Sequence, residues 1–63
     1  MCTEWLYEAI DQEVSVEMNR GDVVRGILRN IDASMNLTVE LPNHTTKVLA
    51  SLAISLIVLP SPS

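Results

Sequence analysis

Short segments of the chain alternate hydrophobic and polar residues with a period of two or are rich in apolar residues, which predicts a protein made mainly of short β-strands. Between Glu13 and Met18, for example, Val14, Val16 and Met18 alternate with polar residues. Other segments show similar patterns and are separated by residues that favour turns. The predicted strands cover Glu13–Met18, Val23–Asp32, Leu37–Leu41, Thr46–Ala50 and Ala53–Leu59.

A short helix is predicted before the first strand, over Thr3–Ile10. It begins with a threonine, which is a good N-cap, and its apolar residues Leu6 and Ala9 fall on one face. At about two turns this helix is too short to be stable alone, so we expect it to pack across the end of the sheet. Trp5 and Tyr7 are the side chains expected to anchor it there.

Glycine marks two positions where the sheet has to change direction. Gly21, in the turn Asn19–Asp22, supplies the positive φ that a tight hairpin requires. Gly26 interrupts the apolar pattern of the second strand, where glycine indicates a sharp bend or the close approach of another backbone. Such a bend allows a sheet to curl into a small barrel. The remaining breaks fall at Asp32–Asn36, Pro42–Thr45 and Ser51–Leu52.

The length of 63 residues allows one small domain, which we place at residues 1–60, with a frayed tail at 61–63. A domain of this size has a marginal core and usually needs a disulfide, a metal or oligomerisation to be stable. Cys2 is the single cysteine, which excludes an internal disulfide, and one cysteine with one histidine cannot complete a zinc site. We therefore predict no metal site and expect partner subunits to supply the missing stability.

Charge and composition exclude several classes of function. A net charge of −4 argues against a nucleic-acid binder that acts alone, although not against RNA contact inside an assembly. Because the chain carries neither a nucleophile–base pair nor a glycine-rich phosphate loop, we predict no enzyme, no catalytic residue, no cofactor and no small-molecule substrate. No apolar stretch reaches the roughly 20 residues of a membrane-spanning helix, so we expect a soluble, intracellular protein without a membrane partner.

The segment from Val48 to Leu59 is apolar on nearly every side. Strands buried on both faces have this pattern, and an exposed terminal strand of this kind invites pairing with another chain. A closed ring, in which each terminal strand pairs with a neighbour, would cover it. The side chains that we assign to this ring interface are Val48, Leu49, Ile54, Leu56, Ile57 and Val58.

The segment Val16–Leu37 closely resembles the first signature motif of the Sm/LSm family. That motif combines an alternating strand, a turn with glycine, a glycine in the second strand, and an aspartate followed by Met-Asn. The matching positions are Gly21, Gly26, Asp32, Met35 and Asn36. The second motif of the family is matched in its last strand and its Leu-Pro ending, but Ala50 and Ser51 stand in place of Arg-Gly.

This resemblance implies a fold, a mode of assembly and a function. The expected fold is an N-terminal helix followed by a strongly bent, five-stranded antiparallel sheet. Sm-like subunits form rings, usually of seven, by pairing the fifth strand of one subunit with the fourth of the next, and they bind single-stranded, uridine-rich RNA. The leading interpretation is a subunit of a mixed ring in the core of spliceosomal small nuclear ribonucleoproteins. It implies other Sm/LSm subunits and snRNA as partners, and a nuclear location with a cytoplasmic stage during assembly.

Within the resemblance, the expected RNA-binding residues are Asp32, Ser34, Met35 and Asn36. The amide of Asn36 offers both a donor and an acceptor to a uracil edge, and Asp32 could orient that amide by accepting from its NH₂ group. Ser34 stands where the family packs a side chain on the base. Ala50 and Ser51 could contribute only backbone groups to the site.

Two alternatives remain open. The chain could be an Sm-like protein-interaction module of an snRNP assembly complex, without RNA contact of its own, and the missing Arg-Gly favours this. It could instead be an LSm subunit in mRNA decay, which the sequence does not separate from splicing. Among the other polar residues, we expect a solvated His44, and we expect Arg25 and Arg29 to pair with acidic neighbours such as Glu17 or Glu40.

Overall fold

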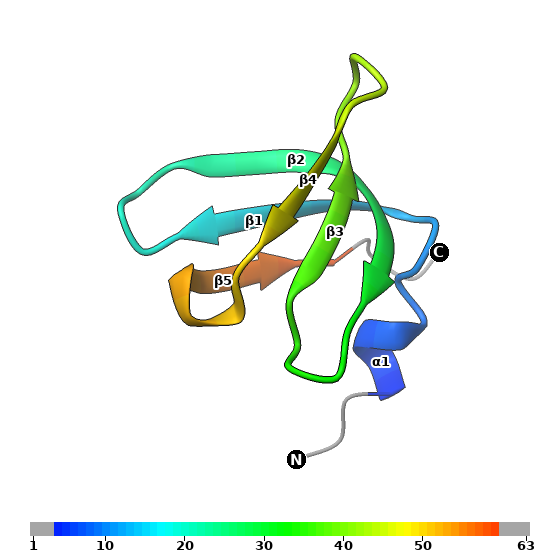
Figure 1. Ribbon diagram of the computed structural model, residues 1–63, viewed down its shortest axis with the longest axis horizontal. Helices are drawn as coiled ribbons and strands as arrows, with labels where there is room; N and C mark the ends of the chain where they lie inside the picture. Colours follow the sequence, from blue (N-terminus) through cyan, green and yellow to red (C-terminus); the bar gives the residue numbers. More distant parts are fainter. Residues whose placement is uncertain (1–3, 60–63) are drawn as a thin grey trace.

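The computed structural model describes residues 4–59 and shows a short helix followed by one bent antiparallel sheet (Figure 1). The helix α1 covers Glu4–Tyr7. The strands are β1 Glu13–Met18, β2 Val23–Ile31, β3 Leu37–Glu40, β4 Thr46–Leu49 and β5 Ile54–Val58, and a 3-10 helix, η1 Ser51–Ala53, precedes β5. The predicted fold class is confirmed, and each predicted strand agrees with the observed one to within one residue at either end.

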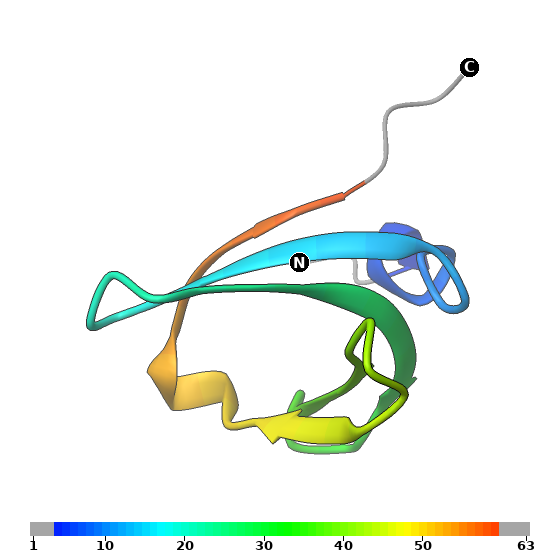
Figure 2. The same cartoon turned by 90° about the horizontal axis from the view of Figure 1, so that it is seen from above.

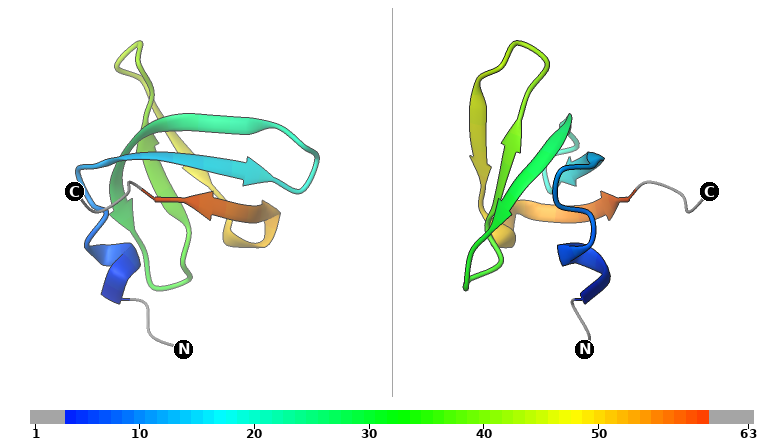
Figure 3. Two further views of the ribbon diagram at one scale, coloured as in Figure 1. Left: turned by 180° about the vertical axis from the view of Figure 1, so that it is seen from behind. Right: turned by 90° about the vertical axis from the view of Figure 1, so that its right-hand side faces the viewer.

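The order of strands in the sheet is β4-β3-β2-β1-β5, so β4 and β5 are its two outer strands. The long strand β2 pairs through Val23–Ile27 with β1 and through Ile27–Ile31 with β3. Its register with β3 shifts between Leu28 and Asn30. Figure 2 shows β2 curving at this point, so that β3 and β4 turn back to face β1 and β5. Seen from behind, β5 lies alongside β1 (Figure 3).

Gly26 sits where β2 begins to curve, and the next strands leave no room for a side chain there. A Cβ atom at this position would collide with the carbonyl oxygen of Glu40 and would lie 2.7 Å from Cγ1 of Val39. The close backbone approach predicted from the sequence is therefore confirmed. Gly21 has φ +93, as the predicted hairpin turn requires.

The core fills the inside of the bend. Apolar side chains from α1, from the turn after it and from alternate positions of the strands meet there, because period-two alternation puts every second side chain on the concave face. The buried residues are Leu6, Ala9, Val14, Val16, Leu28, Ile31, Leu37, Val39 and Leu49.

The helix differs from its prediction in length and in its anchors. The helix ends at Tyr7 instead of Ile10. The side chains of Trp5 and Tyr7 are 52% and 44% exposed, so the expectation that they anchor the helix was wrong. Leu6 is the buried side chain of the helix. The chain turns because Asp11, at φ 71, donates its N–H to the carbonyl of Leu28 at 2.6 Å. The predicted threonine N-cap, Cys2 and the tail at 61–63 lie outside the described residues.

Candidate nucleic-acid interface

The loop between β2 and β3, residues 32–36, is closed by the carboxylate at its start. Oδ1 of Asp32 accepts hydrogen bonds from the backbone N–H groups of Ser34 and Asn36, both at 2.9 Å. The backbone N–H of Met35 donates to the carbonyl of Asp32 at 2.9 Å, and Met35 takes φ 64. Aspartate favours such turns because its side chain replaces a backbone partner. The loop is thus fixed by its own hydrogen bonds.

The amide of Asn36 joins this loop to the start of η1. Its Nδ2 donates to Oδ2 of Asp32 at 3.0 Å, and its Oδ1 accepts from the backbone N–H of Ser51 at 2.9 Å. The bond to Asp32 is the one expected from the sequence. The bond to Ser51 was not predicted, because it spans 15 residues and depends on the bend that brings the two segments together.

After these bonds, the Asn36 amide keeps one N–H and one oxygen lone pair. A uracil presents one N–H and carbonyl oxygens along its pairing edge, so the remaining groups are complementary to it. Ser34 is exposed beside the amide, while Met35 is half-buried and packs against the core. The structure therefore gives Met35 a supporting place under the loop, leaves Ser34 at the surface and leaves Asn36 half-buried.

The second expected part of the site, Ala50 and Ser51, offers little side-chain surface. Ala50 is exposed, and Ser51 is half-buried with its N–H already bonded to Asn36. Neither side chain is planar, so this chain does not place its own stacking partner over a base here. The neighbouring Leu52 is highly exposed and accepts a hydrogen bond through its carbonyl from Nδ2 of Asn19 at 2.8 Å.

The electrostatics of the loop keep Asp32 ionised. The backbone N–H of Asn36, its side-chain amide and the backbone N–H of Ser34 all hold the pKa of the Asp32 carboxyl below its ordinary value. Each of these donors stabilises the charged form. The carboxylate is thus engaged within the loop, and the uncharged amide of Asn36 carries the free hydrogen-bonding groups.

The basic residues of the sheet lie in other surroundings. Arg29 bonds Asp11 through Nη1 at 2.8 Å and Glu40 through Nε at 2.9 Å, so the predicted pair with Glu40 is confirmed. Nδ1 of His44 lies 3.4 Å from Oε2 of Glu40, and the ring is otherwise solvated as expected. Among residues 4–59, the exposed Arg25 takes part in no ion pair, in contrast to its prediction.

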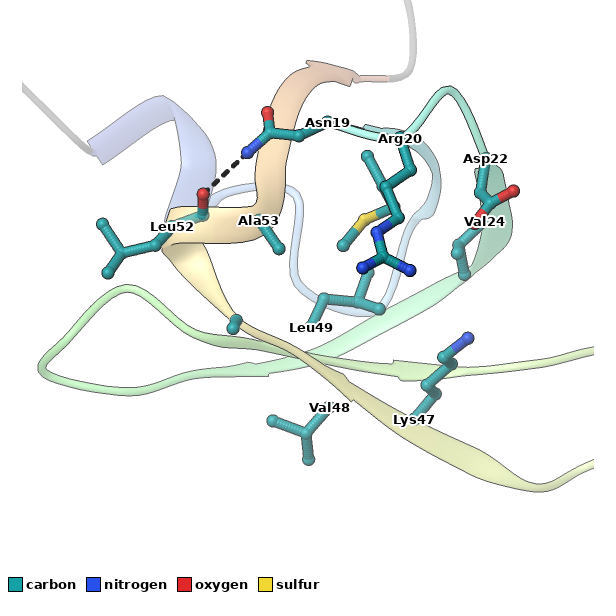
Figure 4. Close-up of a pocket in the computed structure, with 11 residues that line it drawn as sticks. Asn19, Arg20, Asp22, Val24, Lys47, Val48, Leu49, Leu52 and Ala53 are labelled. Atoms are coloured by element: carbon teal, nitrogen blue, oxygen red, sulfur yellow. Dashed lines mark hydrogen bonds between the residues drawn. The ribbon is translucent and has the colours of Figure 1, made fainter.

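A groove of about 590 Å³ lies between β4, η1 and the hairpin that joins β1 to β2 (Figure 4). Its floor is apolar and includes Met18, Val24 and Leu49, whereas Arg20 and Lys47 line its rim. The sequence did not predict this groove, because its residues come from three separate segments and no short motif marks their meeting.

Metal binding and membrane insertion each require a recognisable arrangement of residues. In the part of the chain that is described, no group of three or more histidine, cysteine, aspartate or glutamate residues is placed to hold a metal ion. No helix within residues 4–59 has the length and apolar character needed to cross a membrane.

The family model described as "LSM domain" matches residues 4–59, and the chain therefore belongs to the LSm-domain family. Its fold is similar to that of the SmAP (LSm) protein from Methanococcus vannielii, with a TM-score of 0.78 and 23% identity over 90% of this chain and 92% of that one. It is also similar, with a TM-score of 0.78 and 22% identity, to a chain solved in a study of activation of the Dcp1:Dcp2 mRNA decapping complex by Edc3 and Scd6. That match covers 98% of this chain and 62% of that one. None of the curated proteins matches the chain in sequence.

Membership of this family identifies the chain as an Sm-like protein. The family consists of RNA-associated, ring-forming scaffolds that are generally not enzymes, which agrees with the absence of catalytic motifs in the sequence.

Proposed function

We propose that this chain is a subunit of a mixed, seven-membered Sm-like ring that binds single-stranded, uridine-rich RNA in the core of spliceosomal small nuclear ribonucleoproteins. The observation that carries the proposal is the hydrogen-bonded unit formed by Asp32, Asn36 and Ser51. This unit fixes a half-buried amide that keeps one N–H and one oxygen lone pair beyond these two bonds. The proposal places the protein in the nucleus, with a cytoplasmic stage during assembly.

In this proposal the chain supplies one nucleotide site and performs no chemistry. The amide of Asn36 bonds the edge of a uracil, and Ser34 contacts the base from the loop surface. Because Ala50 replaces the arginine of the family motif, stacking and most of the charge come from neighbouring subunits. The net charge of −4 supports this division, since affinity for phosphate grows with the number of cations supplied.

The outer strands support assembly into a ring. Val48 on β4 is 67% exposed, and Leu56 and Val58 on β5 are 53% and 54% exposed. Both strands also present an unpaired backbone edge within the described sheet, which pairing with a neighbour would cover. Ile54 and Ile57 are half-buried against the core. Leu49, also expected at the interface, is only 2% exposed, so its side chain is buried and only its backbone is available to a neighbouring subunit.

A role in mRNA decay is the second candidate function. It is favoured by the similarity to a chain solved in a study of the Dcp1:Dcp2 mRNA decapping complex. Sequencing the RNA that copurifies with the tagged chain separates the two, because a splicing role predicts snRNA and a decay role predicts mRNA. Recovery of protein partners without any RNA would instead favour the interaction module of an snRNP assembly complex.

The proposed site is tested by substituting Asn36 with alanine in the full chain, purifying it with its ring partners and measuring binding of a fluorescent oligouridine at low salt. Asn36→Ala removes the free amide groups and leaves the N–H of Ser51 without its partner. We expect affinity to fall about tenfold or more, the cost of one good bidentate contact. Asn30→Ala, at an exposed position on β2, is the matched control and should bind like the parent chain. Equal affinity for RNA in the folded Asn36→Ala chain would refute the site.

A further inference from the structure

Two of the four basic residues of this acidic chain lie at one groove. Arg20 and Lys47 line the groove beside β4, and Asp22 is the acidic residue that lines it with them. No ion pair joins Asp22 to either cation within residues 4–59. Figure 4 shows Arg20 reaching from the β1–β2 turn over Leu49, and Lys47 pointing from β4 towards the opposite rim. The groove is therefore locally positive in a chain whose net charge is −4.

The groove lies beside a free strand edge. Because β4 is an outer strand, the backbone groups along one side of Thr46–Leu49 have no ladder partner within the described sheet. Lys47 and Leu49 are two residues apart, so they occupy the same face of β4, and both line the groove. A strand added at this edge would place two of its own side chains opposite them. The favourable pattern is a carboxylate opposite Lys47 and, at the position opposite the buried Leu49, an apolar side chain that packs on the half-buried Met18 and Val24 of the groove.

The β5 strand of a second copy does not have this pattern. Its sequence, Ile54–Val58, contains no charged residue on either face, and the same is true of the whole stretch from Val48 to Leu59. Pairing with it would cover Arg20 and Lys47 with apolar side chains. Covering a cation without giving it a partner is unfavourable, because the lost hydration is not replaced.

We propose that the groove beside β4 receives the edge strand of a different subunit, one that carries a carboxylate two residues from an apolar side chain on the same face. This inference rests on the proposed function, because it takes β4 to be an edge of a ring. It deepens that function by stating the chemistry of the neighbour on one side. The apolar surface at Met18 and Val24 favours a strand over RNA, whose backbone would contact only the rim.

The test uses the full chain and three fluorescein-labelled peptides that differ at one position. The first is Val-Ser-Leu-Thr-Glu-Val-Ser, and the others carry Gln or Lys in place of Glu. Fluorescence anisotropy should show that the Glu peptide binds about tenfold more tightly than the Gln peptide at low salt. In Lys47→Glu, which changes an exposed side chain, this preference should disappear and the Lys peptide should bind best. Arg25→Glu, on the exposed face of β2 away from the groove, is the matched control and should keep the preference for Glu.

Three results would overturn the inference. Equal binding of the Glu and Gln peptides would show that Arg20 and Lys47 do not recognise a carboxylate. Displacement of the Glu peptide by oligouridine would assign the groove to RNA. A stable ring of the chain alone, seen by native mass spectrometry, would show that a second copy fits. In that last case the mixed composition of the ring would fail as well, but RNA binding by the ring would leave the proposed RNA site at Asn36 intact, so the two failures can be told apart.

Discussion

Substitution of Gly26 by alanine should be far more damaging than the addition of one methyl group suggests. The new Cβ would collide with the backbone carbonyl of Glu40 and approach Cγ1 of Val39 at 2.7 Å, against 3.4–4 Å for an ordinary contact. Overfilling a packed core costs about 1–3 kcal/mol, occasionally more. A backbone carbonyl in a strand ladder cannot move aside as a side chain does, so we expect about 3 kcal/mol or more. Domains of this length have a total stability of about 3–9 kcal/mol.

The assay is urea unfolding followed by circular dichroism, with Gly21→Ala as the control. Gly21 has φ +93, and a methyl group added there would meet no atom within 4 Å, so its substitution costs only the strain of a left-handed conformation. That strain is about 1–2 kcal/mol. The bend therefore predicts a much lower urea midpoint for Gly26→Ala than for Gly21→Ala. Equal midpoints, or a more stable Gly26→Ala chain, would refute the close approach of β2 and β3.

Three further outcomes follow from the contacts of single side chains. In the folded chain the pKa of Asp32 lies below its ordinary value of 3.8. The ionised carboxylate therefore stabilises the fold above pH 3.8, and this stabilisation is lost as the pH falls through the folded pKa. Asp32→Asn should accordingly show a smaller drop in urea midpoint on acidification than the parent chain. Arg29→Met should lower the midpoint slightly at low salt and not at high salt, because its ion pairs are exposed. Leu28→Ala, at a side chain with 0% exposure, should cost about 2–5 kcal/mol and leave much of the chain unfolded by circular dichroism.

Local patterns in the sequence were enough to predict the strands, because β1 and β3 alternate apolar and polar residues and the other strands are short apolar-rich runs between turns. The same applies to the loop that begins at Asp32, whose carboxylate bonds the N–H groups of nearby residues. Gly26 could be interpreted correctly because glycine weakens an apolar strand unless a bend or a close backbone approach requires it. These features depend on residues that are close in sequence, or on one residue type with a narrow range of uses.

Contacts between distant segments were not predictable in the same way. The helix ends early because Asp11 and Gln12 bond Leu28 on β2, and these tertiary bonds compete with another helical turn. The bond from Ser51 to Asn36 exists only because the bend in β2 brings two loops together. The groove containing Arg20 and Lys47 likewise arises from the arrangement of three segments.

The link between Asn36 and Ser51 gives the missing Arg-Gly a structural context. Ser51 keeps the backbone N–H that positions the amide, so the loss of the family's usual pair does not loosen the loop. What the chain lacks at Ala50 is a planar, charged side chain. Under the proposed function, the loop therefore hydrogen-bonds a base edge while other subunits supply stacking and charge.

The central claim, that this amide-bearing loop contacts uridine, is tested most directly by photocrosslinking the chain, with its copurifying ring partners, to an oligonucleotide that contains 4-thiouridine. Peptide mapping by mass spectrometry should place the crosslinks at residues 32–36 and 50–52, on the two loops joined by Asn36. Crosslinks confined to the partner subunits would contradict the claim and leave this chain as a scaffold without an RNA site of its own. Crosslinks confined to the groove at Arg20 and Lys47 would also contradict it, by moving the RNA site of this chain to that groove.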